Sequence, residues 1–266
     1  MLLTGCGREE SFAPVSTKCP APTATPVPAE TPAAELRYDV AEFPLLPMHE
    51  LCPALGYELE IESEQRVLLD GRALEYFPEG YLCFDGRYLY APEGWRQQGD
   101  ELWLEADAAV KLLNLRQEDG LIIADTGLSK LLSSGEDYYD IHFDMELTYW
   151  LPQIINAEAK GQPLEGMIGV GNVVMNRMES ELFPNKISSV LFEREYAIQF
   201  EPVQNGSIKA EPDDRARIAA YLCLEGYNTV GESLYFVNPA FGSGWFDRDL
   251  QLYKAIGDHN FYVLKD

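Results

Sequence analysis

Glu158 is the acidic residue whose position in this sequence most suggests chemistry. It lies in the stretch IINAEAKGQPLEG, residues 154–166. Three apolar residues precede it at offsets of four, seven and eleven, namely Ile154, Leu151 and Leu147. Side chains at these offsets share one face of a helix. The spacing therefore places a carboxyl group at the end of an apolar stripe.

The helix that carries Glu158 is predicted to be short. It is expected to start near Pro152, because proline is tolerated in an opening turn, and to end at Gly161. The negative end of the helix dipole and the apolar neighbours both favour the neutral acid, which predicts a raised pKa for Glu158. Such an acid can protonate the leaving oxygen of a glycosidic bond. The same spacing also allows an acid at the exposed edge of the helix, without a role.

Amides and aromatic rings in the following segments are candidates for binding a sugar, because sugar sites combine apolar faces with a few fixed hydrogen-bonding groups. Asn176 is expected on the polar face of a helix, where it could hold either a neighbouring group of the protein or a sugar amide. Gln199 and Phe200 lie in a loop-and-short-helix region. The remaining candidates follow near the C-terminus: Tyr235, Asn238 and His259.

Each of these last three residues also has a local explanation. Tyr235 fits the core of a strand, and Asn238 precedes Pro239 and so fits a turn. His259 could close a pair of strands through a satisfied hydrogen bond. The sequence favours this structural role slightly for His259.

Metal, cofactor and cysteine chemistry are not expected. The three histidines lie far apart, at 49, 142 and 259, and the five cysteines, at 6, 19, 52, 83 and 223, show no zinc spacing. Cys223 is expected inside a helix, whereas catalytic thiols favour helix N-termini. Cys52 and Cys83 either form a disulfide or remain buried thiols. The net charge of −24 and the absence of a basic cluster in the sequence argue against nucleic acid as a partner.

The elements that must position these residues are preceded by a segment of different composition, residues 1–36. Leu3-Thr4-Gly5-Cys6 resembles the lipobox of bacterial lipoproteins, whose cysteine carries a lipid. Almost nothing precedes this motif, so either the true start lies upstream or the match is accidental. The Pro-, Thr- and Ala-rich spacer over 13–34 favours the first explanation. We expect an extracytoplasmic protein that contacts a membrane only through a lipid on Cys6.

The rest of the chain is predicted to be α+β, with two domains joined by a polar connector at 127–145. Residues 37–126 alternate strands, Gly turns and two short helices, and they resemble the copper-amine-oxidase N-terminal-like domain. No copper is expected there, and the expected role is that of a spacer or attachment module. Its aromatic residues either form a binding face or belong to the core: Tyr76, Phe77, Tyr81, Tyr88 and Trp95. Residues 146–266 are expected to be helices followed by a small β-hairpin.

The second domain resembles the cell wall hydrolase family of spore-cortex-lytic enzymes (SleB/CwlJ type). The motifs IINAEAKGQPLEGMIGVGNVVMNRM, FP, QFEPVQNG, LYFVNP and IGDHNFY occur in the family's order over 146–263. The resemblance implies a lysozyme-like, transglycosylase-related fold, peptidoglycan glycan strands as the partner and Glu158 as the catalytic residue. It also implies a location on the cell wall or spore.

The resemblance further implies a lytic transglycosylase, in which one glutamate acts as acid and then as base. A glycosidase that uses water would need a second carboxylate, and Glu165, Glu201 and Asp247 are candidates that no spacing distinguishes. Glu165 could equally be a structural partner. A zinc or cysteine amidase is disfavoured by the scattered histidines, and a non-catalytic wall-binding lipoprotein remains an alternative.

Overall fold

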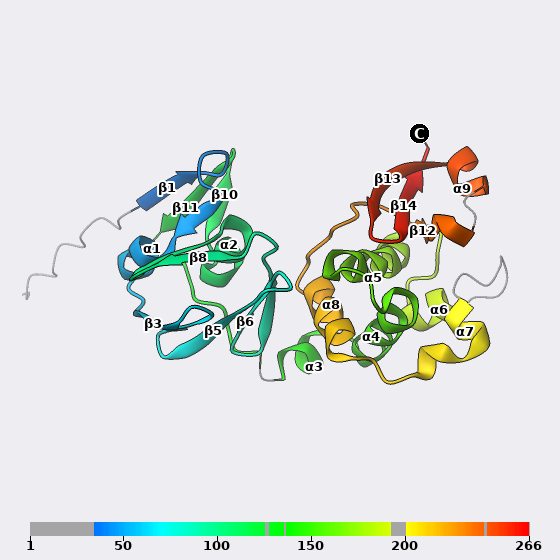
Figure 1. The fold of residues 1–266 in the computed structure, drawn as a ribbon, viewed down its shortest axis with the longest axis horizontal. Coiled ribbons are helices and arrows are strands. Elements are labelled where there is room, and N and C mark those ends of the chain that lie inside the picture. The colour runs from blue at the N-terminus through cyan, green and yellow to red at the C-terminus, as the bar shows by residue number, and fades with distance from the viewer. Residues whose placement is uncertain (1–34, 126–127, 136, 193–200, 242–243, 266) are drawn as a thin grey trace, which may run out of the picture. The chain divides into compact units, whose positions relative to one another are not determined.

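The β-rich module is built from short antiparallel strands around two helices (Figure 1). A computed structural model describes residues 35–125, 128–135, 137–192, 201–241 and 244–265. The module's elements are β1 (Glu35–Asp39), β2 (Leu45–Pro47), α1 (Met48–Ala54), β3 (Leu59–Ser63), β4 (Arg66–Leu69), β5 (Arg72–Phe77), β6 (Tyr81–Phe84), β7 (Arg87–Tyr90), β8 (Trp95–Gln98), β9 (Glu101–Glu105), α2 (Ala106–Leu113), β10 (Arg116–Glu118) and β11 (Leu121–Asp125). The strands form three sheets, ordered β1-β11-β10, β2-β9-β8 and β3-β4-β5-β6-β7.

Local sequence explains this meander well. In β4 the buried residues Val67 and Leu69 alternate with half-buried ones, as expected for a strand with one face on a core. Three Asp-Gly pairs join successive strands with positive φ at both residues: Asp70-Gly71, Asp85-Gly86 and Asp119-Gly120. This conformation matches the right-handed twist of a hairpin, and Asp-Gly is a preferred sequence for it. Cys52 and Cys83 are free thiols, so the disulfide alternative is wrong.

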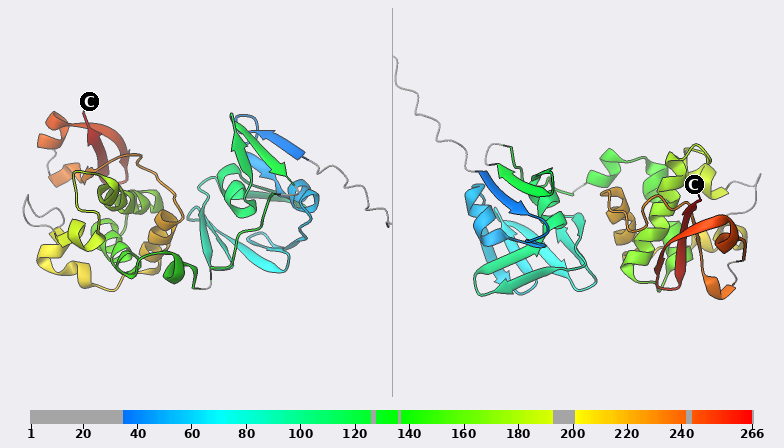
Figure 2. Two further views of the ribbon diagram at one scale, coloured as in Figure 1. Left: turned by 180° about the vertical axis from the view of Figure 1, so that it is seen from behind. Right: turned by 90° about the horizontal axis from the view of Figure 1, so that it is seen from above.

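The helical domain comprises residues 138–265. Its elements are α3 (Tyr138–His142), α4 (Met145–Ala159), α5 (Leu164–Glu179), α6 (Ile187–Phe192), α7 (Glu201–Asn205), the 3₁₀ helix η1 (Ser207–Lys209), α8 (Asp214–Leu224), β12 (Tyr235–Val237), the 3₁₀ helix η2 (Pro239–Phe241), α9 (Gly244–Asp249), β13 (Leu250–Ile256) and β14 (His259–Leu264). Helices α4, α5 and α8 contact one another and form the core, as Figures 1 and 2 show. Mixed α and β structure confirms the predicted class at this coarse level.

Helix α4 is longer than predicted. It begins at Met145, where the side chain of Asp144 accepts a hydrogen bond from the Glu146 backbone N–H, so Pro152 lies in its interior. The fully buried Leu151 and Ile154 favour helix across the proline, since burying each such side chain contributes about 1.5–3 kcal/mol. The predicted end is confirmed, because the helix stops at Ala159 and Gly161 has a φ of +90°.

The C-terminal strands differ from the prediction in one respect. A small β-hairpin is predicted here, but the stretch KAIGDHNFYVLK alone forms two strands, because Gly257 and Asp258 make a turn between β13 and β14. Strand β12 pairs with the other side of β14, which gives a three-stranded antiparallel sheet ordered β12-β14-β13. The turn requires a positive φ of +56° at Gly257, which explains the interruption.

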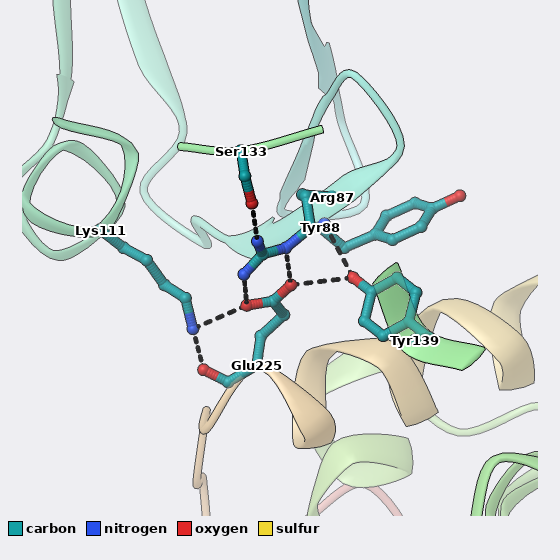
Figure 3. Close-up of polar contacts among 6 residues, drawn as sticks. All are labelled: Arg87, Tyr88, Lys111, Ser133, Tyr139 and Glu225. Carbon is teal, nitrogen blue, oxygen red and sulfur yellow. Dashed lines mark hydrogen bonds and ion pairs between the residues drawn. The ribbon is translucent and has the colours of Figure 1, made fainter. Parts of the chain in front are cut away.

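A buried charge network joins the β-rich module to the helical domain (Figure 3). Both belong to one compact unit, residues 33–266. Arg87 on β7 donates from Nε and Nη2 to the carboxylate of Glu225, directly after α8, at 2.5 and 2.8 Å. Lys111 on α2 lies 3.0 Å from the same carboxylate, and the Tyr139 hydroxyl donates to it at 3.0 Å. Tyr139 belongs to the segment predicted as a polar connector, yet it is buried.

Candidate active site

A cavity of about 380 Å³ lies in the helical domain beside Glu158. Its walls come from the end of α4, the end of α5, β12 with the turn after it, α9 and the start of β14 (Figure 1). The lining residues are Glu158, Gln162, Arg177, Tyr235, Phe236, Val237, Asn238, Phe241, Phe246 and His259. This volume lies within the usual range for small-molecule sites.

Glu158 is the penultimate residue of α4 and is half-buried. The preceding residues on its face, Leu151 and Ile154, have no exposed surface, so the apolar stripe predicted from the spacing exists. Because the stripe packs into the core, the helix end is fixed and Glu158 is directed to the cavity edge. Glu158 therefore lies at the edge of the cavity, while its role stays a prediction.

Arg177 supplies a buried positive charge to the same cavity. Its side chain is only 3% exposed, and its Nε donates to the Leu234 carbonyl at 2.8 Å. The guanidinium lies 4.9 Å from the Phe183 ring centroid and 5.5 Å from that of Tyr235. Burial lowers the pKa of Arg177 to about 10, although the charges of Tyr235 and Glu158 oppose this shift. Arg177 therefore remains a cation near neutral pH and interacts electrostatically with the Glu158 carboxylate.

Three further predicted residues, Tyr235, Asn238 and His259, lie on the walls of this cavity. The carboxamide oxygen of Asn238 accepts from the Ala240 backbone N–H at 3.0 Å, so this residue both shapes the turn and lines the cavity. The turn explanation and the site explanation are thus compatible for Asn238.

His259 is held as a neutral imidazole near neutral pH. It is 6% exposed and packs edge-on against Phe236, with ring centroids 5.3 Å apart. Burial lowers its pKa, and the nearby Asp258 carboxylate opposes this effect. Among the described residues its Nδ1 has no hydrogen-bond partner, so the structure does not show the satisfied hydrogen bond expected from the sequence.

Gln162 is a wall residue that sequence reasoning missed. Its Oε1 accepts from the Asp258 backbone N–H at 2.9 Å, and its Nε2 donates to the Asp258 carboxylate at 3.1 Å. These bonds tie the turn after α4 to the turn between β13 and β14, so Glu158 and His259 are held at one cavity. The sequence analysis predicted a helix end at Gly161, and the glutamine that follows directly was the available signal.

Asn176 does not line the Glu158 cavity in the described structure. Its side-chain amide donates to the carbonyls of Gly231 and Ser233, at 2.7 and 2.9 Å. These contacts place it beside another cavity, of about 760 Å³, and give it a structural function. The neighbouring Arg177 occupies the position that Asn176 was expected to fill. Gln199 and Phe200 lie outside the described residues, as does Cys6.

None of the second-acid candidates lines this cavity in the part of the chain that the structure describes. Glu165 forms an ion pair with Lys254, with Oε1 and Nζ 2.6 Å apart, which agrees with a structural partner. The Asp247 carboxylate accepts a hydrogen bond from the Tyr262 hydroxyl at 2.7 Å. The side chain of Glu201 is not described.

Within the described ranges no three His, Cys, Asp or Glu side chains group in a way that could hold a metal ion. The buried Cys223 donates through its thiol to the Ile168 carbonyl at 3.4 Å, and burial raises its pKa. The thiolate needed by a cysteine nucleophile is therefore disfavoured. No described helix has the length and apolar character needed to span a bilayer.

Comparison with known proteins finds relatives of the helical domain, and the family model and the individual relatives point to the same kind of protein. Residues 161–262 match the family model described as Cell Wall Hydrolase. A spore cortex-lytic enzyme of Oceanobacillus iheyensis is 40% identical over 108 residues, which cover 40% of this chain and 38% of that protein. The spore cortex-lytic enzyme of Bacillus subtilis is 37% identical over 112 residues, covering 42% of this chain and 35% of that protein.

Among solved structures, the catalytic domain of the germination-specific lytic transglycosylase SleB from Bacillus anthracis is similar to this chain. The sequences are 28% identical and the TM-score is 0.42, with 46% of this chain and 98% of that domain covered. This chain spans well under half the length of the two spore cortex-lytic relatives, 38% and 35%. Glu158 lies just before the segment matched by the family model, which begins at residue 161.

Proposed function

Since residues 161–262 belong to the cell wall hydrolase family of spore-cortex-lytic enzymes (SleB/CwlJ type), we propose that this protein cleaves the glycan strands of peptidoglycan. Glu158 is the general acid and base, and the helical domain has the lysozyme-like, transglycosylase-related fold. The observation that carries the proposal is the position of Glu158 at a cavity that also holds Tyr235, Asn238 and His259. A half-buried carboxyl group beside aromatic and amide walls suits a neutral saccharide.

The reaction begins with transfer of a proton from the Glu158 carboxyl group to the glycosidic oxygen between N-acetylmuramic acid and N-acetylglucosamine. The bond from C1 of the muramic residue to that oxygen breaks, which leaves an oxocarbenium ion and the Glu158 carboxylate. The positive charge of Arg177, whose interaction with Glu158 was described above, stabilises this carboxylate.

The second step needs no further acid. The C6 hydroxyl of the same muramic residue attacks C1, and the Glu158 carboxylate takes the hydroxyl proton, which regenerates the acid. The product is a 1,6-anhydro end and no water is consumed. Glu158 is the one carboxylate among the described residues that line the cavity, and this favours the single-acid route over a two-carboxylate glycosidase.

Replacement of the catalytic acid tests the proposal. We expect Glu158→Gln to lower cleavage of purified sacculi by at least about 10²-fold, because the amide cannot donate the proton, while the fold is retained. Glu165→Gln is the matched control. It removes the ion pair with Lys254, which lies outside the cavity. An exposed ion pair contributes about 0–1 kcal/mol to folding stability, so this variant should fold normally and cleave at the unchanged rate. Full activity of Glu158→Gln would refute the assignment.

Mass spectrometry of the products separates the proposal from its rivals. Anhydro-muropeptides are expected. Reducing ends would instead indicate a glycosidase that uses water, freed stem peptides an amidase, and intact wall a non-catalytic wall-binding protein. Because the substrate lies outside the cytoplasm, we also propose an extracytoplasmic location, with a lipid on Cys6 as the proposed anchor. The names of the relatives favour spore cortex as the substrate.

A further inference from the structure

The β-rich module contains a cavity of its own, which the proposed reaction does not use. It has a volume of about 410 Å³ and is lined by Glu64, Gln65, Tyr76, Trp95, Gln97 and Gly99. These residues come from the turn between β3 and β4, from β5, and from β8 with the turn after it (Figure 1). The cavity therefore lies wholly within the module and is separate from the one that contains Glu158.

Two aromatic rings form its apolar wall. The ring centroids of Tyr76 and Trp95 lie 5.6 Å apart, with their planes at 34°. The Trp95 indole N–H donates to the Glu64 carbonyl at 2.9 Å, which fixes the indole plane. Both rings pack partly on the module core and are half-buried, so each retains exposed surface. The pair is held in place before any ligand arrives, which lowers the entropic cost of binding.

Gly94 shows how closely the backbone fits this aromatic pair. A Cβ atom at this position would lie 2.7 Å from the Tyr76 hydroxyl oxygen, and the residue has a φ of +71°. The other aromatic residues that the sequence singled out pack elsewhere. Phe77 stacks on Tyr81 with centroids 4.6 Å apart, and Tyr88 stacks on Tyr221 at 5.6 Å. The aromatic surface of this cavity is thus limited to Tyr76 and Trp95 among the described residues.

Gln97 supplies the polar part of the cavity. Its Nε2 donates to the Gly99 carbonyl at a long 3.5 Å, and its buried Oε1 has no hydrogen-bond partner among the described residues. A buried acceptor without a donor costs free energy in the unliganded protein. Because this oxygen is buried, a ligand hydroxyl or amide N–H pairs with it only after the Gln97 side chain turns into the cavity, and that pairing would remove the cost.

We infer that this cavity binds an N-acetylhexosamine unit of a glycan strand. The apolar face of a sugar ring suits the Tyr76 and Trp95 rings, and its hydroxyl or amide group can donate to Gln97. An anionic ligand is disfavoured, because no cation lines the cavity in the described residues and the chain has a net charge of −24. The identity of the polymer rests on the proposed function. The site would hold the protein on the wall, and this would raise the effective concentration of glycan strands at the catalytic cavity.

The test uses the full chain with Glu158→Gln, so that bound saccharide is not cleaved. The probe is chitotriose, a trimer of N-acetylglucosamine, and the readout is the NMR signal of the Trp95 indole N–H. We expect this signal to shift and saturate on titration. Gln97→Met keeps the side-chain length but removes the acceptor, and should weaken binding about three- to tenfold.

Gln98→Met is the matched control, because residue 98 is exposed on the same strand and faces the opposite side from Gln97. It should leave the affinity unchanged. A structural role for Gln97 would lower the melting temperature of Gln97→Met, whereas loss of an unpaired buried acceptor should leave it unchanged or raise it.

Three results would overturn the inference: a Trp95 signal that chitotriose does not move, equal affinity of Gln97→Met, or equal binding of a glucose trimer. Cleavage of sacculi by the unsubstituted chain is measured in parallel. Failure of Trp95 binding with cleavage intact rejects this site alone. Binding at Trp95 without cleavage rejects the catalytic proposal and keeps the saccharide site.

Discussion

At the scale of single residues, the candidate site brings together side chains whose charge states are set by burial. Arg177 stays positively charged although burial lowers its pKa to about 10, and His259 is kept neutral because burial lowers its pKa. Glu158 thus has one fixed cation as a neighbour and no competing proton donor in His259 near neutral pH. The cation favours the Glu158 carboxylate that takes the proton back, and it opposes the neutral form that donates the proton.

The buried state of His259 predicts a pH dependence of folding stability. Its folded pKa lies below the ordinary value of about 6.5, so the unfolded chain binds more protons as the pH falls below that value. The unsubstituted chain should therefore lose stability below about pH 6.5, by at most about 1.4 kcal/mol per pH unit from this group. Urea unfolding at pH 7.5 and 5.5 measures the loss.

His259→Gln is the comparison, because glutamine is polar but does not titrate. The difference in unfolding free energy between the two proteins should change between these pH values, and the loss on acidification should be smaller for His259→Gln. Parallel pH profiles for the two proteins would contradict the account. The comparison cancels contributions from the other titrating groups, which both proteins share.

The residues of the site differ in how well the sequence could predict them. The position of Glu158 on an apolar face follows from residues within eleven positions of it, because helical periodicity is local. Arg177 and Gln162 owe their places to hydrogen bonds with residues 57 and 96 positions away. Such long-range contacts leave no periodic signal, so these wall residues could not be recognised before the strands were placed.

At the scale of elements, α5 is packed so closely on its neighbours that two of its three glycines, Gly169 and Gly171, leave no room for a Cβ atom. At both positions the atoms that a Cβ would meet first belong to side chains of neighbouring segments. A Cβ on Gly169 would lie 2.8 Å from Val230 Cγ1, and one on Gly171 would lie 2.7 Å from Cys223 Sγ. The prediction failed for the start of α4, because the Pro152 signal was weaker than the burial of the helix face.

The fit of α5 can be tested by adding one methyl group. Gly171→Ala should destabilise the protein by about 1–3 kcal/mol, because the new Cβ would overlap Cys223 Sγ and the Ile155 side chain, 2.9 Å away at Cδ1. Gly166→Ala is the control on the same helix, since its nearest neighbour, Ile256 Cγ2, is 3.4 Å away. Alanine is favoured over glycine in a helix by up to about 1 kcal/mol, so Gly166→Ala should be neutral or stabilising. Urea unfolding gives both values, and equal destabilisation would contradict the packing argument.

At the scale of the whole molecule, residues far apart in the sequence join the β-rich module to the helical domain. The Arg87 and Glu225 side chains are 5% and 2% exposed, and Lys111 and Tyr139 contact the same carboxylate (Figure 3). No sequence pattern indicates this contact, because Arg87 and Glu225 lie 138 positions apart and each is an ordinary charged residue in its own segment. If the proposed saccharide site attaches the module to the wall, this network also holds the helical domain, which contains Glu158, close to the wall.

The network predicts that removal of one partner is costly. Glu225→Gln would leave Arg87 and Lys111 facing a neutral amide at a buried position. Because an uncompensated charge is then buried, the free energy of unfolding should fall by about 3–5 kcal/mol. Unfolding of the variant should also separate into two transitions, one for each domain. The double variant Arg87→Met with Glu225→Leu should recover much of the stability, because it buries no unpaired charge between these positions.

Acid should reproduce the effect of that substitution. Burial raises the pKa of Glu225, but the hydrogen bond from Arg87 and the charge of Lys111 outweigh burial and leave this pKa below its usual value. A carboxyl group with a lowered folded pKa contributes stability that is present above the unfolded value of about 4.3 and is lost as the pH falls through the folded pKa. Unfolding midpoints of the unsubstituted chain should therefore fall steeply below about pH 4, while those of the Arg87→Met, Glu225→Leu variant should fall less. Equal acid sensitivity of the two proteins would show that the network does not link the module to the helical domain energetically.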